Sequence, residues 1–105
     1  MPVITPHQPS FSYSAFHLYP IRLNFDLIKN THVEVFETLR SQGVGVNLHY
    51  IPIHTQPYYQ GLGFAKEDYP EANNYYSSAI SLPLYPGLSL VEQDEVVSVL
   101  GQALV

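Results

Sequence analysis

Apolar and polar side chains alternate along three short segments of the chain, and this period of two is typical of half-buried β-strands. The segments are residues 16–25, 44–48 and 80–84. In the second segment two valines and a leucine would face a core, so Gly45, Asn47 and His49 would share the opposite, more polar face. Such a face is expected to look toward a ligand or another domain.

Two helices are predicted by their capping signals. Residues 31–34 and 89–92 both match the S/T-x-x-E pattern, which satisfies the free amides of a helix's first turn. The first helix would end at Gly43 and the second would span residues 90–104. The apolar residues expected on the buried sides are Val33, Phe36 and Leu39 in the first helix, and Val96, Val97, Leu100 and Leu104 in the second.

A further helix is predicted from Pro70 to about Ala79, with one short helical turn at Tyr58–Gly61. Residues 1–12, which contain three prolines, are interpreted as an irregular lead-in or linker, and residues 13–105 as one domain. The order is then strand, helix, strand, loop, helix, strand, helix. It predicts a mixed α/β (α+β) fold in which helices cover one face of a sheet of about three strands.

Prolines 52 and 57 bound a loop that follows the second predicted strand. Because proline cannot continue a helix and lacks a ladder donor, the chain should leave the sheet in a stiff, extended form. The loop carries hydrogen-bonding and aromatic groups, namely His54, Thr55, Gln56, Tyr58 and Tyr59. This combination is typical of a ligand-contacting surface, and the tyrosines could stack on a sugar ring. For Tyr75 and Tyr76, helical spacing with Ile80 favours a core position for at least one.

Composition limits the possible function classes. The 105 residues allow one domain, and 46% hydrophobic residues suffice for a core. Only 12% are charged, against roughly 25% in typical soluble domains, so other protein is expected to cover part of the surface. The net charge of −5 argues against nucleic-acid binding. Without cysteine or a membrane-length apolar run, the chain is expected to be soluble and cytoplasmic, away from membranes.

The residues that could carry chemistry do not form a complete catalytic set. His17, His49 and His54 invite a zinc hypothesis, but they include no tight pair and no cysteine assists them, so free histidines are the favoured interpretation. Neither a G-x-S-x-G elbow nor a phosphate-binding loop is present. Lys29 and Lys66 lie in polar, turn-like stretches, unlike a desolvated Schiff-base lysine. Spacing alone therefore indicates a binding loop.

Three runs of sequence add a resemblance. Residues 17–23 read HLYPIRL, residues 43–54 read GVGVNLHYIPIH, and residues 79–88 read AISLPLYPGL. In this order, over roughly residues 13–104, they resemble the C-terminal small domain of the DegT-type sugar aminotransferases. Within that family the run VNLHYIPIHTQPYY is most similar to the transaminase that makes UDP-4-amino-4,6-dideoxy-N-acetyl-altrosamine for pseudaminic acid, and to spore-coat polysaccharide relatives.

The resemblance implies a mainly antiparallel sheet and a fold-type-I enzyme that uses pyridoxal 5'-phosphate as its electron sink. In such dimeric enzymes a large N-terminal domain carries the Schiff-base lysine and the cofactor-binding groups, and glutamate typically donates the amino group to a keto-sugar nucleotide. None of those groups can be placed in this chain. It is therefore expected to be a truncated or excised substrate-lining domain for surface polysaccharide or nonulosonic acid biosynthesis, with no catalytic, cofactor-binding or metal-binding residue and no activity alone.

The resemblance also implies which residues border the sugar nucleotide. They are His49, Tyr50, Ile51, Pro52 and Ile53, with His54 and Gln56 as further candidates. They would wall the pocket and hydrogen-bond the substrate rather than transfer protons. The expected partners are the large domain, the nucleotide-sugar substrate and a second copy of the chain, which would associate through the polar face. The alternatives are a stand-alone nucleotide-sugar or carbohydrate-binding module and a purely structural interaction domain.

Overall fold

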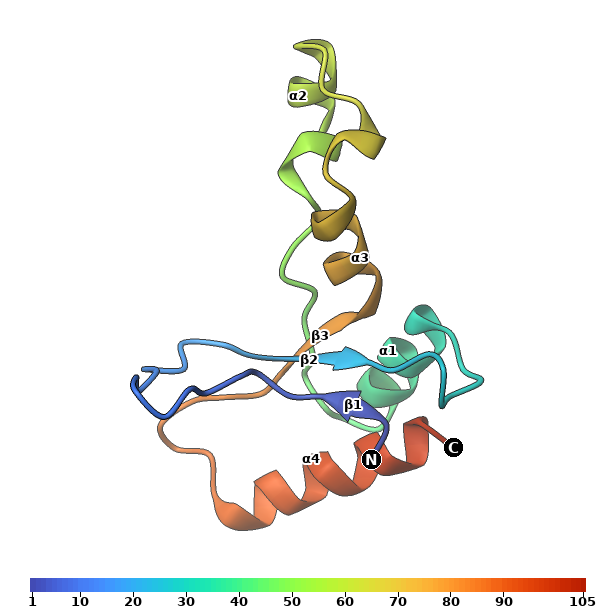
Figure 1. Ribbon diagram of the computed structural model, residues 1–105. Helices are drawn as coiled ribbons and strands as arrows, with labels where there is room; N and C mark the ends of the chain where they lie inside the picture. Colours follow the sequence, from blue (N-terminus) through green and yellow to red (C-terminus); the bar gives the residue numbers. More distant parts are fainter.

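The polypeptide forms a body from which one long arm projects (Figure 1). In the computed structural model, which describes residues 1–105, the body holds a three-stranded sheet and the helices α1 (His32–Ser41) and α4 (Leu90–Ala103). The arm, residues 50–78, contains the 3-10 turns η1 (Ile53–Thr55) and η2 (Lys66–Asp68) and the helices α2 (Pro57–Gly61) and α3 (Pro70–Ser78). The radius of gyration is 15.5 Å, against about 13 Å for a domain of this length without such a projection.

The sheet is antiparallel throughout, in the order β1 (Val3–Ile4), β2 (Tyr19–Leu23), β3 (Ala79–Leu82). This confirms the mixed fold class with a small antiparallel sheet. The outer strand β1, however, lies within residues 1–12, where the sequence predicts an irregular lead-in. Pairing with β2 orders those residues, since Val3 lies opposite Leu23. Prolines 2 and 6 flank the strand and limit its length.

Residues 44–48 do not form the predicted second strand. Only Asn47 pairs with the sheet, opposite Ser81. The amides of the two valines in this segment are used locally, bonded to the carbonyls of Leu39 and Val44, and so are not available to a neighbouring strand. The alternation of apolar and polar residues still predicts burial correctly, because both valines are buried while Asn47 is exposed.

The core lies between one face of the sheet and the two body helices, as predicted. Its members are Ile21, Leu23, Ile28, Val35, Leu39, Val44, Val46, Ile80, Val99, Leu100, Ala103 and Leu104. Both capping boxes are present: Thr31 and Ser89 accept from the amides of Glu34 and Glu92, whose side chains bond back to the cap amides. The first helix ends at Ser41, and Gly43 with its positive φ follows the capping residue Gln42, as expected.

The buried faces of the two helices are rotated from the predicted ones. In α1, Val33 is 61% exposed and Val35 is buried in its place. In α4, Val97 is 52% exposed and Val99 takes its role. Both helices carry more apolar residues than one face can bury, and the packing of α1 against α4 selects among them. The buried pairs, 35 with 39 and 99 with 103, are each four residues apart, which is the spacing of packing helix ridges.

The arm confirms the two helical segments predicted inside it, since α2 and α3 begin at Pro57 and Pro70. From α3 the chain passes directly into β3, which ends at Leu82 because Pro83 has no amide to donate. The alternation predicted to continue to residue 84 therefore stops early, and Leu84 is exposed.

The arm is fastened to the body at its root. Arg22 of β2 donates from Nε to Ser78 Oγ at 3.0 Å, and its guanidinium lies 5.6 Å from the centre of the Tyr75 ring. On the other side, His32 Nε2 is bonded to the Ala79 carbonyl at 2.8 Å. Beyond this root the arm stands away from the body (Figure 1).

The surface is large and apolar for a chain of this mass. Its accessible area is 7381 Å², whereas a compact monomer of 11.9 kDa has about 5,900 Å². Large apolar side chains lie exposed on several segments, including Phe11, Tyr13, Tyr58 and Leu90. The excess of roughly 1,500 Å² is about twice the area of about 800 Å² that one partner contributes to a standard protein–protein interface. None of the helices combines the length and the hydrophobicity that a membrane span requires.

Candidate functional site

The polar face predicted on residues 45–49 exists, and Ser81 completes it. Asn47 N lies 3.2 Å from Ser81 O, and Ser81 N lies 2.8 Å from Asn47 O. Opposed residues of an antiparallel pair share a face, and so does the residue two positions further on. His49 therefore reaches Ser81 diagonally, with 2.9 Å between its Nδ1 and Ser81 Oγ. The peptide bond between His49 and Tyr50 is cis.

Beside this face lies a hollow of about 460 Å³. Residues 43–49, 81–88 and the first turns of α4 form its walls, together with His17 and Leu18. The polar side chains on it are those of His17, Asn47, His49, Ser81, Tyr85, Glu92 and Glu95. Since it holds two carboxylates and neither lysine nor arginine, the hollow suits an uncharged or cationic group rather than a phosphate.

Tyr85 and Glu92 set the charge at one edge of the hollow. The Tyr85 hydroxyl donates to Glu92 Oε2 at 2.7 Å, and Ser89 Oγ donates to Oε1 at 2.9 Å. The Tyr85 bond, followed by those from Ser89, holds the pKa of Glu92 below its usual value. The same bond, with smaller contributions from desolvation and the carboxylate charge, raises the pKa of Tyr85. At neutral pH this edge is therefore an ionised acceptor beside a neutral phenol.

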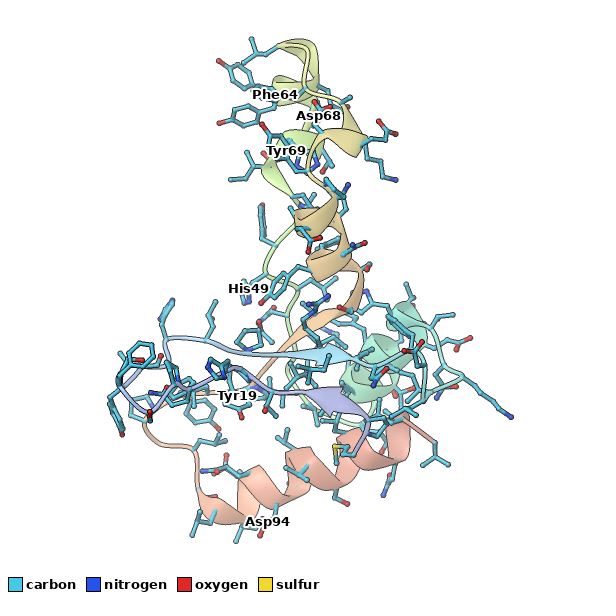
Figure 2. All side chains as sticks on the ribbon, in the orientation of Figure 1. Tyr19, His49, Phe64, Asp68, Tyr69 and Asp94 are labelled. Atoms are coloured by element: carbon cyan, nitrogen blue, oxygen red, sulfur yellow. The ribbon has the colours of Figure 1, made fainter.

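The other predicted site residues do not converge with His49 on this hollow. Ile51 and Pro52 border a separate, open hollow on the arm, and Ile53 and His54 border a third. Figure 2 shows the resulting separation, with His49 at the root of the arm and the aromatic residues Phe64 and Tyr69 at its far end.

Three of the predicted residues differ sharply in exposure. Tyr50 is 63% exposed, Gln56 is half-buried at the start of α2, and His54 is only 7% exposed. His54 Nε2 is bonded to the Lys66 carbonyl at 3.0 Å, and its ring lies against Tyr69 with 4.8 Å between centroids. These contacts hold η1 against η2, so His54 has a structural role within the arm.

The third hollow is an apolar cavity of about 390 Å³ on the arm. Tyr59, Phe64 and Tyr69 supply its aromatic walls, so one tyrosine of the predicted loop lines an apolar cavity. The expectation that Tyr75 or Tyr76 belongs to the core is wrong. Tyr75 is 37% exposed beneath Arg22, and Tyr76 is half-buried with its ring edge-on to His32, because both stand on the projecting α3 rather than over the sheet.

Sequence reasoning missed Ser81 and the Tyr85–Glu92 edge. Ser81 is a polar position of an alternating segment, and it becomes informative only once its pairing with Asn47 is known. Glu92 was explained as a helix cap, and its second bond, to Tyr85, is not visible in the spacing. The three histidines considered for zinc are not brought together, and no group of three potential metal ligands is formed.

Comparison with known proteins identifies the family. The sequence profile of the DegT/DnrJ/EryC1/StrS aminotransferase family matches residues 1–101. The chain belongs to this family. The fold of the chain is shared by Spr1654 of Streptococcus pneumoniae, a proposed sugar aminotransferase whose structure superimposes with a TM-score of 0.88 at 26% identity over 97% of this chain.

Two further proteins are similar to most of the chain. The spore coat polysaccharide biosynthesis protein SpsC of Bacillus subtilis is 36% identical over 90% of it. PseC of Helicobacter pylori, an aminotransferase of pseudaminic acid biosynthesis, gives a TM-score of 0.73 at 27% identity over 84% of it. The chain spans about a quarter of these relatives' lengths: 25% of SpsC, 26% of Spr1654 and 23% of PseC.

The residues of this chain do not by themselves fit pyridoxal phosphate, in whose bound form Spr1654 has been described. The cofactor needs an amine for its aldehyde and cationic or amide donors for its phosphate. Lys29 and Lys66 are both exposed, and neither lines the hollow beside His49. No step of cofactor chemistry is therefore assigned to this chain.

Proposed function

We propose that the chain is the C-terminal, substrate-lining domain of a cytoplasmic, pyridoxal-phosphate-dependent aminotransferase that aminates a keto-sugar nucleotide. The substrate is UDP-linked and the amino donor is glutamate, in a route to surface polysaccharide or a nonulosonic acid such as pseudaminic acid. The Schiff-base lysine belongs to a large N-terminal domain, without which the chain does not transaminate. The observation that carries the proposal is that a DegT/DnrJ/EryC1/StrS family member presents His49 on a polar hollow.

The charges on the hollow indicate which part of the substrate binds there. A nucleotide sugar combines an anionic diphosphate with a neutral sugar, and the hollow contains Glu92 and Glu95 but no cation. The neutral sugar is the part that can lie beside these carboxylates without repulsion. In the proposal, His49 contacts the sugar in this hollow, and Tyr50 contacts it from the start of the arm. Ile51 to Ile53, which border the hollows of the arm and not this one, wall the substrate where it extends past His49, and His54 and Gln56 stabilise the loop. The diphosphate binds to other parts of the enzyme.

The large exposed surface supports association with other protein. The excess area of roughly 1,500 Å² noted above would be covered by the large domain and by a second copy of the enzyme in a homodimer. The low charge of the chain, 12% of residues, agrees with this because interface cores are depleted in charged residues.

A chimera tests the function. This chain replaces the matched quarter of Bacillus subtilis SpsC, and amino transfer from glutamate to UDP-keto-sugars is followed in the presence of pyridoxal phosphate. We expect turnover by the chimera and none by this chain alone. His49→Ala and Tyr50→Ala should each raise KM for the sugar nucleotide, whereas Tyr58→Ala, which changes a tyrosine 71% exposed on the arm, should behave as the parent does.

Two results would count against the proposal. A folded, cofactor-loaded chimera that transfers no amino group to any keto-sugar nucleotide would remove the assigned reaction. Tight binding of a UDP-sugar by this chain alone, lost on Tyr59→Ala but not on His49→Ala, would instead identify a stand-alone binding module that uses the aromatic cavity of the arm.

A further inference from the structure

We infer that Ser81 is a positioning residue that fixes the imidazole of His49 in the tautomer with its proton on Nε2. His49 then offers an N–H donor, and not a base, to the molecule in the hollow. The inference rests on the proposed function only for the identity of that molecule. The position of the proton follows from contacts within this chain.

Ser81 is held rigidly and has little choice of partner. Its backbone amide and carbonyl are both bonded to Asn47, which fixes the position of its side chain on the polar face. Its hydroxyl has a single hydrogen-bond partner, the Nδ1 of His49 at 2.9 Å. Because Ser81 is only 4% exposed, water has little access to the hydroxyl.

Counting protons decides which group donates. A serine hydroxyl has one proton to donate, whereas a neutral imidazole carries its proton on one nitrogen and accepts at the other. If Nδ1 carried the proton, it would donate to Ser81 Oγ and the serine proton would be buried without an acceptor, which folded proteins avoid. If Ser81 donates to Nδ1, both groups are satisfied. The proton of His49 is then on Nε2.

The consequence concerns the ligand that His49 can recognise. With Nδ1 occupied by Ser81, Nε2 is the nitrogen left for a molecule in the hollow. As an N–H group it binds an oxygen acceptor, such as a hydroxyl or carbonyl oxygen of a neutral sugar. It does not accept a proton from the substrate. The role of His49 in the proposed reaction is therefore recognition and orientation.

Long-range proton–nitrogen correlation spectra of the protein labelled with nitrogen-15 in histidine test the inference directly. His49→Gln assigns the signals of His49. We expect these signals to show an unprotonated Nδ1 and a protonated Nε2 at neutral pH. His32 and His54 serve as internal references, because their Nε2 atoms face carbonyl oxygens at 2.8 and 3.0 Å and must carry the proton.

Ser81→Ala keeps the backbone pair with Asn47 but removes the donor. We expect the His49 signals to move toward those of exchanging tautomers, with His32 and His54 unchanged, and Ser81→Thr to restore the parent pattern. A proton on Nδ1, a doubly protonated His49 at neutral pH, or His49 signals unaffected by Ser81→Ala would each overturn the inference.

In the chimera, Ser81→Ala should raise KM for the sugar nucleotide about tenfold with little change in kcat, as expected for the loss of an orienting hydrogen bond. The spectra need no substrate, so they separate the two claims. An Nε2 proton that depends on Ser81 supports the inference even if the chimera is inactive, and inactivity then counts only against the proposed function.

Discussion

Arg22 fastens the arm to the sheet, and its removal should loosen the arm without unfolding the body. In the structure Arg22 donates to Ser78 Oγ at 3.0 Å and lies over the Tyr75 ring at 5.6 Å. A hydrogen bond from a charged donor contributes about 1.5–3 kcal/mol, and a cation–π contact at a partly exposed site about 0.5–1 kcal/mol. Because Arg22 is only half-buried, the lower ends of these ranges apply.

The sum is about 2 kcal/mol, or roughly a 30-fold change in an equilibrium constant. No additional cost arises at Ser78, since its hydroxyl also reaches the Asn74 carbonyl at 3.3 Å and stays satisfied. We therefore expect Arg22→Ala to raise the local opening of α3 about 30-fold. Hydrogen exchange of the α3 amides, measured alongside those of α1 and α4, would record it.

Arg40→Ala provides the matched control. Arg40 donates to the Val46 carbonyl at 3.2 Å and lies over the Phe36 ring at 5.6 Å, so it makes the same kinds of contact, but within the body. It should leave exchange in α3 at the parent rate. If Arg22→Ala also leaves α3 exchange unchanged, or if both variants accelerate it equally, the argument that Arg22 holds the root of the arm is refuted.

Two further predictions concern the core and the response to acid. Val35→Ala should lower the free energy of unfolding by about 2–3 kcal/mol, since two buried methyl groups are lost and a cavity remains. Val33→Ala, on the exposed side of α1, should change the free energy of unfolding little. Equal losses for the two variants in chemical denaturation would contradict the assigned buried face of α1. The folded-state pKa of Glu92 is lowered, so its contribution to stability is present above the ordinary glutamate pKa and disappears as pH falls through the lowered value. Tyr85→Phe should therefore raise the Glu92 pKa toward its ordinary value and make the unfolding free energy less dependent on pH in that acidic range. If NMR shows the same Glu92 titration in Tyr85→Phe as in the parent, the Tyr85 hydrogen bond is not the cause of the lowered pKa.

The elements with local signals were predictable. Both capping boxes, the proline starts of α2 and α3 and the helix stop at Gly43 depend on residues within one turn of each other. The burial of Val44 and Val46 was also predictable, because alternation records which side chains avoid water. The mixed fold class followed from these elements, and the antiparallel order of the sheet from the family resemblance.

The features that the sequence did not reveal depend on distant partners. Strand β1 has only two residues, and it is ordered by pairing with residues some twenty positions later. The choice of Val35 over Val33 is made by α4, which lies more than fifty residues away along the chain. At the site, His49 was identified by its place on the polar face, but Ser81, 32 residues further on, is recognised only through the hydrogen bond that joins them.

The pairing of Asn47 with Ser81 has a consequence for how this fold can vary. The two backbone bonds tie together the chain just before it leaves for the arm and just after it returns. The arm is therefore a closed excursion whose ends are fixed in the body, and loop-closure entropy changes only slowly with the length of such an excursion. The arm can therefore be replaced, in evolution or by design, with segments of other lengths and other side chains. The sheet, its two helices and the His49–Ser81 contact stay in place.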